Sequence, residues 1–389
     1  MTHDVDRVPL QEVRDLLRPG EVLPFSVLDT HERLLLSAGQ RLVNEAQFEA
    51  LIDRGAWAER ALVAAERVAR ALASNGDAAV EAAVLLPSLF DGWERLLWQF
   101  DKISRGLASS LLPGSVVPTF WKSLQAQVDA DPDVALFFCL RQEDHRFALY
   151  AQHHAIHCAV VTLLATRLLA WSAERQDAMG CAALTMNLAM LELQALMAEQ
   201  SDPPTKRQIE RIRAHPEAAV ALLTQAGITD PEWLSTVLQH HEHPKGGGYP
   251  QGLTEVSDAA HLLRLADVYM AKVSPRALRA PLAPVMAMRQ LFQQNPGDPL
   301  AMAMIKAMGV HPPGALVTLQ SGEVAVVIRR PASGTHPIVA TLSNTQGHPV
   351  AHTHRRDTAE AGYDIHGPLA DAKLYPRVLP DRVFGWIAG

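Results

Sequence analysis

The stretch that most constrains the fold of this chain runs from Pro118 to Phe292. It alternates segments of helical periodicity with short polar breaks, and it contains no convincing strand. Such a pattern predicts an all-helical bundle, in which ligand sites are built from side chains on facing helices. The predicted helices are Thr119–Ala130, Asp133–Gln142, Phe147–Ala173, Asp177–Glu199, Pro204–Gly227, Pro231–His241, Val256–Lys272 and Pro281–Gln294.

Different patterns flank the bundle on both sides. Two short apolar runs of strand length, Glu21–Val27 and Arg33–Leu36, and a short helix, Asn44–Arg54, predict a small α+β module. Helical periodicity from Ala58 to Leu112 follows. After Asn295 the runs Ala315–Leu319, Glu323–Arg329 and Ile338–Leu342 are typical of strands. We therefore expect an α+β module at 1–57, a helical connector at 58–115, a helical domain at 116–310 and a β-rich extension at 311–389.

Composition describes a soluble globular protein of two or three domains, with 389 residues, 48% hydrophobic residues and 20% charged residues. The net charge of -7 argues against binding of a nucleic-acid polymer through its phosphates. Three cysteines without a CxxC pair predict neither a disulfide framework nor a thiolate zinc site. The beginning of the chain lacks the apolar core of a secretion signal, and no apolar run reaches the ~18 residues of a membrane span. A cytoplasmic location is the expectation.

Histidines are numerous, at seventeen, and several fall on different predicted helices of the bundle. Each one taken alone is most often a hydrogen-bonded structural residue. A series of imidazoles with a late carboxylate on facing helices instead favours a metal site, because these ligands suit Fe, Mn or Zn. The series comprises His153, His154, His157, His215, His240, His241 and Asp267.

The segment Gln239–Leu253 places a histidine pair, His240 and His241, directly before a glycine-rich turn, Gly246–Pro250. One interpretation is a helix that ends there, with histidine at its negative end and glycine as its stop. The other is a metal site whose edge continues into a ligand-facing loop. Spacing alone leaves both open.

These motifs together resemble the HD-GYP domain. The resemblance rests on the HHE segment followed by a GYP turn, on an upstream His-Pro and on the aspartate of Ala266-Asp267-Val268-Tyr269, and it covers about residues 116–310. The family is a branch of the HD phosphohydrolases that hydrolyses the bacterial second messenger cyclic di-GMP. The resemblance implies a mainly α protein with an HD-GYP-type bundle, and weaker similarity extends to the segments that flank the bundle.

The resemblance assigns candidate roles to individual residues of this chain. His215, His240, His241 and Asp267 match the family's metal ligands, and a first-helix ligand falls on His154, with His157 as the alternative. The loop residues Lys245, Gly246, Gly248, Tyr249 and Pro250 would face a ligand or partner. Arg276 and Arg279 resemble an R-x-x-R element that could share a helical face and donate to phosphate, or could form a solvated basic turn.

The sequence departs from the family at its name-giving His-Asp dyad. Met186 and Asn187 occupy the dyad positions, and no histidine occurs anywhere from Cys158 to Ala214. Met190 replaces a lysine, Lys245 replaces an aspartate of the loop, and Tyr150 stands where some relatives have a glutamate. A neutral amide cannot replace the carboxylate that bridges two cations. We therefore expect no catalytic residues and at most one Fe, Mn or Zn ion, or none.

Three functions follow from this pattern. The leading hypothesis is a bacterial signalling protein without catalytic activity that binds cyclic di-GMP or a partner signalling protein. The second is an active metal-dependent cyclic di-GMP phosphodiesterase with a remodelled site, in which His153 or His157 supplies a substitute ligand. The third is a structural helical adaptor that forms a homodimer through the N-terminal module and the helices of Ala58–Leu112.

Overall fold

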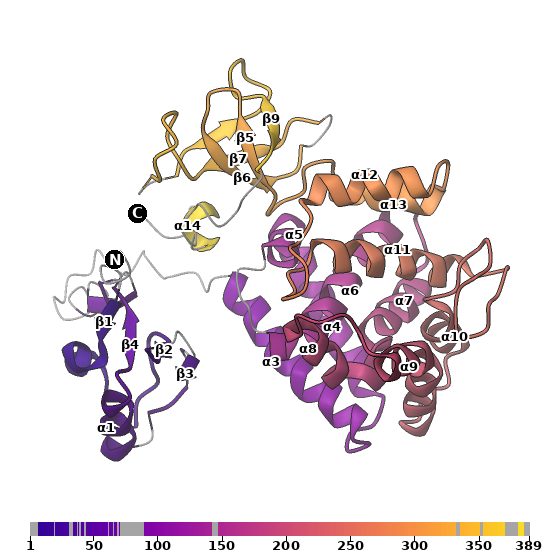
Figure 1. The fold of residues 1–389 in the computed structure, drawn as a ribbon, viewed down its shortest axis with the longest axis horizontal. Helices are drawn as coiled ribbons and strands as arrows, with labels where there is room; N and C mark the ends of the chain where they lie inside the picture. Colours follow the sequence, from indigo (N-terminus) through magenta and orange to yellow (C-terminus); the bar gives the residue numbers. More distant parts are fainter. Residues whose placement is uncertain are drawn as a thin grey trace. The chain divides into compact units, whose positions relative to one another are not determined.

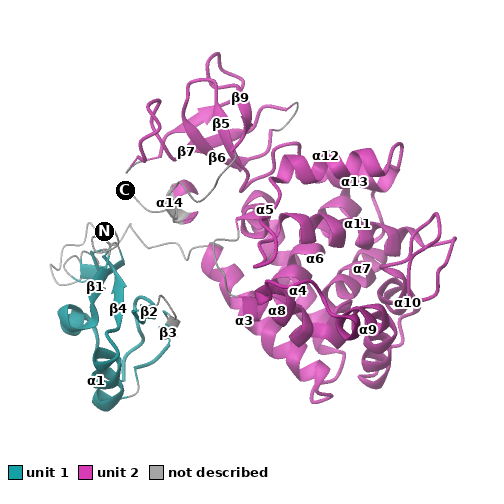
Figure 2. Cartoon of the chain, viewed as in Figure 1, with its two compact units in different colours: residues 1–86 teal, residues 87–389 magenta. Residues whose placement is uncertain are grey.

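The chain forms two compact units in the computed structural model, Met1–Leu86 and Pro87–Gly389 (Figures 1 and 2). The structure describes residues 7–70, 89–141, 147–331, 335–350, 353–369 and 380–384, apart from positions 19, 31–33, 37, 39, 43, 61, 65, 68 and 69. Each unit has a hydrophobic core of its own. The prediction of a mainly α protein is confirmed, since helices dominate the second unit and strands are few.

The first unit is a small α+β module built on an antiparallel sheet. The strands lie in the order β1-β4-β2-β3, and α1 begins where Asn44 Oδ1 accepts from the Gln47 amide at 2.9 Å. The predicted strand at Glu21–Val27 is wrong for most of its length, because Pro24 has no N–H to donate and only Val27 enters a strand there. The elements are β1 (Arg7–Pro9), η1 (Leu10–Leu16), β2 (Val27–Leu28), β3 (Leu34–Leu36), α1 (Glu45–Asp53) and β4 (Trp57–Glu59).

Helices form most of the second unit. The prediction of helical structure from Ala58 to Leu112 is wrong at its start, where β4 includes Ala58. Residues 71–88 of this range lie outside the described residues. The helices are α3 (Leu89–Ala108), α4 (Val116–Ala130), α5 (Pro132–Leu140), η2 (Phe147–Leu149), α6 (Tyr150–Leu168), α7 (Ala173–Thr185), η3 (Leu188–Met190), α8 (Leu191–Glu199), α9 (Lys206–Gln225), α10 (Pro231–Gln239), α11 (Asp258–Val273), α12 (Pro284–Gln294), α13 (Pro299–Met308) and α14 (Pro380–Phe384).

Helix α6 is the core of the bundle. Every residue from Tyr150 to Thr166 is buried except His153, and α7, α11 and α13 pack around this helix (Figure 1). Two segments of the described residues, Phe147–Leu168 and Ala173–Glu199, are long and apolar enough to cross a membrane by composition. Because their apolar stretches are mostly buried within the bundle, they are accounted for as core helices.

One predicted helix is broken in the structure. The segment Asp177–Glu199 divides into α7, the short turn η3 and α8, and the break falls at Met186 and Asn187. Asn187 has φ -103° and ψ 14°, and Met190 has φ -133° and ψ 24°, so neither continues an α-helix. The apolar periodicity passes through the break, which explains why the sequence pattern does not show it.

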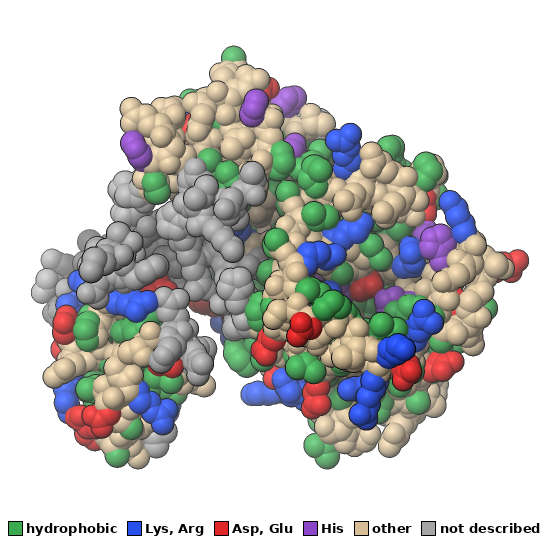
Figure 3. All heavy atoms as spheres, in the orientation of Figure 1, with side chains coloured by type: hydrophobic (Ala, Val, Ile, Leu, Met, Phe, Trp, Pro, Cys, Tyr) green, Lys and Arg blue, Asp and Glu red, His purple; other side chains and the backbone are tan. Residues whose placement is uncertain are grey.

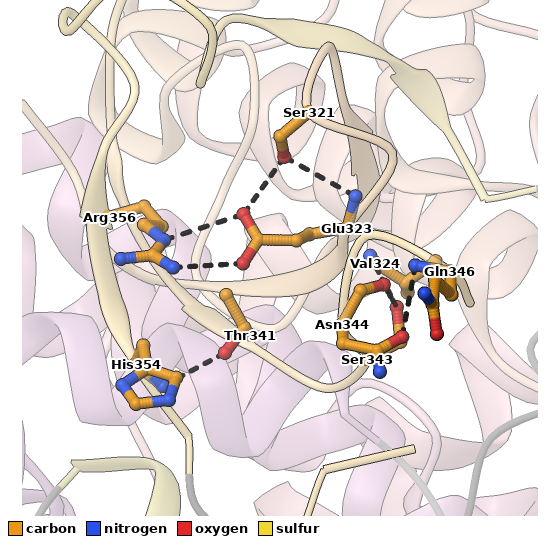
Figure 4. Close-up of polar contacts among 9 residues, drawn as sticks. All are labelled: Ser321, Glu323, Val324, Thr341, Ser343, Asn344, Gln346, His354 and Arg356. Carbon is orange, nitrogen blue, oxygen red and sulfur yellow. Dashed lines mark hydrogen bonds and ion pairs between the residues drawn. The ribbon is translucent and has the colours of Figure 1, made fainter. Parts of the chain in front are cut away.

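The second unit ends in an antiparallel sheet with strand order β8-β7-β6-β5-β9. Arg329 at the end of β6 bonds Asp131 beside α5 at 2.6 Å, which ties the sheet to the bundle. Figure 4 shows the polar contacts within the sheet, where Arg356 donates to both carboxylate oxygens of the buried Glu323 at 3.0 and 3.4 Å. The strands are β5 (Leu316–Leu319), β6 (Val324–Arg329), β7 (Ile338–Thr341), β8 (Arg355–Asp357) and β9 (Ile365–Pro368).

Candidate metal centre and ligand loop

Two helix irregularities hold His215 and His240 in position. Pro216 lies inside α9 and has no N–H, so it leaves the carbonyl of Ile212 without its helical donor. The Nδ1–H of His215 donates to that carbonyl at 2.5 Å. Helix α10 ends at Gln239, and the Nδ1–H of His240 donates to a carbonyl of the last turn, that of Val237, at 2.6 Å. Each imidazole therefore carries its proton on Nδ1.

The two remaining ring nitrogens face one another. The Nε2 atoms of His215 and His240 lie 3.1 Å apart. Each Nε2 carries an unprotonated lone pair, because Nδ1 carries the proton in each ring. Burial is the main cause that lowers the pKa of His215 to about 4 and that of His240 to about 3, so both rings are neutral near pH 7. Two lone pairs at this distance repel each other unless a cation lies between them, and the pair thus fits a metal ion.

His241 completes a group of three imidazoles. Ligand atoms of His215, His240 and His241 all lie within 4.8 Å of one another. The ring of His241 is stacked against Tyr249, with ring centres 4.5 Å apart. Burial, followed by the proximity of His240, lowers the pKa of His241 to about 3, so it too offers a neutral nitrogen. The structure thus places together the three predicted histidines of the late segments.

Asp267 on α11 connects this group with α6. Its Oδ1 accepts a hydrogen bond of 2.7 Å from His154 Nε2, and its Oδ2 lies 3.9 Å from Nδ1 of His241. Burial alone would raise the pKa of Asp267, but the hydrogen bond from His154 and the nearby histidines outweigh it and lower the pKa. His154 and Asp267 therefore lie beside the three histidines, whereas the alternative ligand, His157, belongs to no group of candidate ligands among the described residues.

Cys158 is a candidate ligand that the sequence analysis did not single out. Its Sγ lies 3.6 Å from His154 Nε2, and it forms a second group with His154 and Asp267 whose ligand atoms lie within 4.8 Å of one another. Burial raises the pKa of the Cys158 thiol, so it would ligate only if a metal displaced its proton. The spacing of four residues from His154 on one helix could have indicated it.

The loop after the histidine pair is held by Glu242. This fully buried carboxylate accepts from the amides of Gln251, Gly252 and Leu253 at 2.6, 3.0 and 2.9 Å. A Cβ at Gly248 would lie 2.5 Å from the Cα of Glu242, so only glycine allows this close approach. The predicted ligand-facing residues Lys245, Gly246, Gly248, Tyr249 and Pro250 all lie on this loop, with Lys245 exposed.

The predicted arginine pair does not share a helical face. Arg276 and Arg279 lie in a turn after α11 and form an isolated β-bridge with each other, because α11 ends at Val273. Arg276 donates to the hydroxyl of Tyr150 from Nε at 2.9 Å and from a terminal nitrogen at 2.5 Å. Arg279 is exposed and donates to the carbonyl of Ala271 at 2.7 Å. The two arginines therefore lie in a turn, as in the alternative, but only Arg279 is solvated, since Arg276 is half-buried against Tyr150.

At the dyad positions, Met186 and Asn187 are buried in the break between α7 and α8. Both polar side-chain atoms of Asn187 are buried and have no hydrogen-bond partner within the described part of the chain. A buried amide without partners is unfavourable by about 1–3 kcal/mol for each unsatisfied group. Asn187 is therefore a buried polar side chain without a hydrogen bond to any described residue.

Comparison with known proteins agrees with the helical domain. Residues 143–298 match the model of an HD domain family, HD_5. The chain is similar to cyclic di-GMP phosphodiesterase PA4108 of Pseudomonas aeruginosa, with 29% identity over 182 residues, which are 46% of this chain and 44% of that protein. The chain thus matches less than half the length of this relative.

Among solved structures, the chain is similar to Bd1817, a HDG"Y"P protein from Bdellovibrio bacteriovorus. The identity is 12%, the TM-score is 0.47, and the match covers 77% of this chain and 98% of that one. The HD domain match covers the histidine pair and the Gly-Tyr-Pro turn that follows it. Residues 143–298 thus match an HD domain, and the motifs in this segment are similar to those of HD-GYP proteins.

Proposed function

We propose that this protein binds cyclic di-GMP or a partner signalling protein through its HD-GYP domain and does not hydrolyse the nucleotide. The observation that carries the proposal is Asn187, a buried neutral amide with neither polar atom partnered among the described residues. Two cations ~3.5–4 Å apart need a bridging anion. An amide supplies no charge for that purpose.

The proposed metal site holds at most one Fe, Mn or Zn ion. His215, His240 and His241 would hold it, since their neutral nitrogens converge, and Oδ2 of Asp267 is the nearest carboxylate oxygen. When bound, such an ion acts as a Lewis acid toward a phosphate oxygen. The protein's own contribution is to fix the imidazole tautomers through the carbonyls of Ile212 and Val237.

Recognition is assigned to the loop beside the cluster. Tyr249 is stacked on His241, so a ligand that reaches the cluster would pass an aromatic ring, and Lys245 places an exposed cation on the same loop. An anionic nucleotide with two guanine bases, or an acidic protein surface, matches these groups. A cytoplasmic location and dimer formation through the N-terminal helical region remain parts of the proposal.

A remodelled phosphodiesterase is the second candidate. The specific observation in its favour is the group of His154, Cys158 and Asp267, which offers a second set of ligands next to the three histidines. His153 and His157, the substitute ligands expected from the sequence, contact each other and the ring of Phe138. If this candidate is correct, Cys158 and not a further histidine supplies the replacement.

Metal content, nucleotide binding and turnover together test the proposal. We expect purified full-length protein supplied with Mn²⁺ or Fe²⁺ to hold no more than one ion per chain. It should bind cyclic di-GMP in calorimetry and leave it intact in a chromatographic turnover assay. A partner-only role is indicated if the nucleotide is not bound at tens of micromolar.

The double variant Met186→His, Asn187→Asp restores the dyad residues and serves as the matched comparison. We expect it to bind additional metal and to gain turnover, because the carboxylate supplies the missing bridging charge. Turnover by the unmodified protein that is lost in Cys158→Ser would instead establish the remodelled phosphodiesterase.

A further inference from the structure

A hollow of about 360 Å³ lies between α11 and α12, beside the candidate metal centre but without any of its ligands. Its size is at the lower end of small-molecule sites, which span about 300–1,000 Å³. Arg264, Leu265 and Val268 of α11, Leu291 and Gln294 of α12, and His243 of the loop line it. We refer to it as the α11–α12 hollow.

Arg264 is an unpaired cation in the wall of this hollow. Its side chain is half-buried, and it forms no hydrogen bond or ion pair with any residue that the structure describes. Burial lowers the pKa of Arg264, and Asp267, one helical turn further along α11, is close enough for its negative charge to act in the opposite direction, but the two described side chains form no ion pair. Partly burying a guanidinium that has no direct ion pair is unfavourable, and arginines removed from water are normally paired. The arrangement therefore favours an external anion as the partner.

His243 supplies a second donor at the same hollow. The backbone amide of Lys245 donates to its Nδ1 at 3.1 Å, so a neutral His243 ring carries its proton on Nε2. That Nε2–H is a hydrogen-bond donor in addition to the guanidinium of Arg264. Two donors from different segments, the loop and α11, thus line one hollow. Figure 3 shows blue basic side chains near a purple histidine over the helical part of the second unit, Pro87–Gly389.

The position of Arg264 relates the hollow to the metal centre. Arg264 is close enough to His241 and His243 for its charge to influence both rings. A guanidinium beside a metal ion is repelled by that ion unless an anion lies between them. A phosphate group that contacts the metal on one side and Arg264 on the other would remove this repulsion.

We propose that Arg264 and His243 form a phosphate-binding subsite in the α11–α12 hollow, which takes a phosphate group of the ligand bound at the metal centre. The identity of that ligand as a cyclic dinucleotide rests on the function proposed above, whereas the phosphate chemistry does not. The guanidinium of Arg264 donates two parallel hydrogen bonds to two phosphate oxygens, and the Nε2–H of His243 donates to a third phosphate oxygen.

Titration of the full-length protein with inorganic phosphate tests the subsite directly, with and without a metal chelator. We expect Arg264→Gln to weaken phosphate binding by about tenfold or more in both conditions, since a charge-assisted contact is lost. Arg264→Lys should retain part of the affinity. Arg289→Gln is the control, because Arg289 is an exposed arginine of the neighbouring α12 that does not line the hollow. Equal phosphate affinity in Arg264→Gln, Arg289→Gln and unmodified protein would overturn the proposal.

A parallel titration with cyclic di-GMP separates this inference from the proposed function. If phosphate binding depends on Arg264 but cyclic di-GMP does not bind, the subsite stands and the nucleotide function fails. If cyclic di-GMP binds with the same affinity in Arg264→Gln, the nucleotide function stands and the subsite is refuted. Circular dichroism of each variant establishes that it is folded, and recovery of affinity in Arg264→Lys excludes a general loss of structure.

Discussion

Helix α11 takes part in two histidine–carboxylate pairs that differ in what surrounds them. His261, near its start, lies 2.5 Å from Oδ2 of Asp298, and Asp267, nearer its end, lies 2.7 Å from Nε2 of His154. In the first pair, Oδ1 of Asp298 also accepts from the amides of Leu300 and Ala301 at 2.8 and 3.2 Å and so caps α13. Every carboxylate oxygen of that pair is occupied by the protein's own donors.

The pair of Asp267 has acceptor positions left over. Among the described residues, Oδ2 accepts no hydrogen bond, and Nδ1 of His241 lies 3.9 Å from it. Beside it the Nε2 atoms of His215 and His240 face one another. The two pairs contain the same chemical groups, so the pair itself does not identify a ligand site. What distinguishes them is whether lone pairs converge without protons to satisfy them. By that criterion the α13 cap is structural and the Asp267 cluster is a candidate for a cation.

Loss of metal binding is the largest effect expected from this difference. His240→Gln removes one of the converging lone pairs and should weaken binding of Mn²⁺, Fe²⁺ or Zn²⁺ by more than about 100-fold. Even the loss of a residue that only hydrogen-bonds to a metal ligand lowers metal affinity by about 10–100-fold. His261→Gln should leave metal affinity unchanged. Elemental analysis after dialysis against a competing chelator measures both. Equal metal content in the two variants would show that the comparison does not separate a ligand site from a structural pair.

A third carboxylate, that of Glu242, extends the comparison, because it is fully buried and forms no ion pair with any described residue. Glu242 is satisfied by three backbone amides of the loop that follows it. Glu242→Gln keeps the size but removes the charge and some acceptor capacity, so we expect a loss of about 2–3 kcal/mol in the free energy of unfolding. Urea unfolding measures this loss, with Glu255→Gln on the exposed part of the same loop as the control.

Limited proteolysis tests the same variant locally. If Glu242 holds the loop, cleavage near Gly246 and Gly247 should become faster in Glu242→Gln and stay unchanged in Glu255→Gln. An unchanged unfolding curve together with unchanged cleavage would mean that the three amide contacts do not stabilise the loop.

Much of the bundle was predictable because its apolar faces repeat at helical spacing. The predicted helix ends at Ala130, Glu199 and Gln294 agree with the structure. Helix α13 escaped prediction because its ten residues are apolar on most sides and follow Asn295, where the character of the sequence changes. The break at Asn187 escaped it because apolar periodicity alone does not report backbone dihedral angles.

Site residues that belong to a sequence motif were predictable. Site residues that only the packing of the helices brings to the site were not. His215, His240, His241, His154 and Asp267 were chosen by spacing and resemblance, and the structure places them together. Cys158 and Arg264 could be identified as candidates only from the structure, in which α6, α11 and the loop pack together. Neither residue type at its position stands out from an apolar helix in sequence, since a lone cysteine or arginine there is usually structural or solvated.

The smallest effect concerns the pH dependence of the structural pair. Burial alone would raise the pKa of Asp298, but the hydrogen bond from His261 and the amides of Leu300 and Ala301 outweigh it and lower the pKa. A carboxyl whose pKa is lowered in the folded state stabilises the protein at pH values above its unfolded-state pKa of ~3.9. This contribution is lost as the pH falls through the folded-state pKa.

His261→Asn should therefore reduce the free energy of unfolding by about 1 kcal/mol at pH 7, with a smaller difference at pH ~3. Asp298→Asn retains a good helix cap, and it should show the same reduced pH dependence, because the titrating group itself is gone. Unfolding curves of the three proteins between these pH values measure the effect, and a His261→Asn difference that is constant with pH would show that the pair contributes no ionic stabilisation.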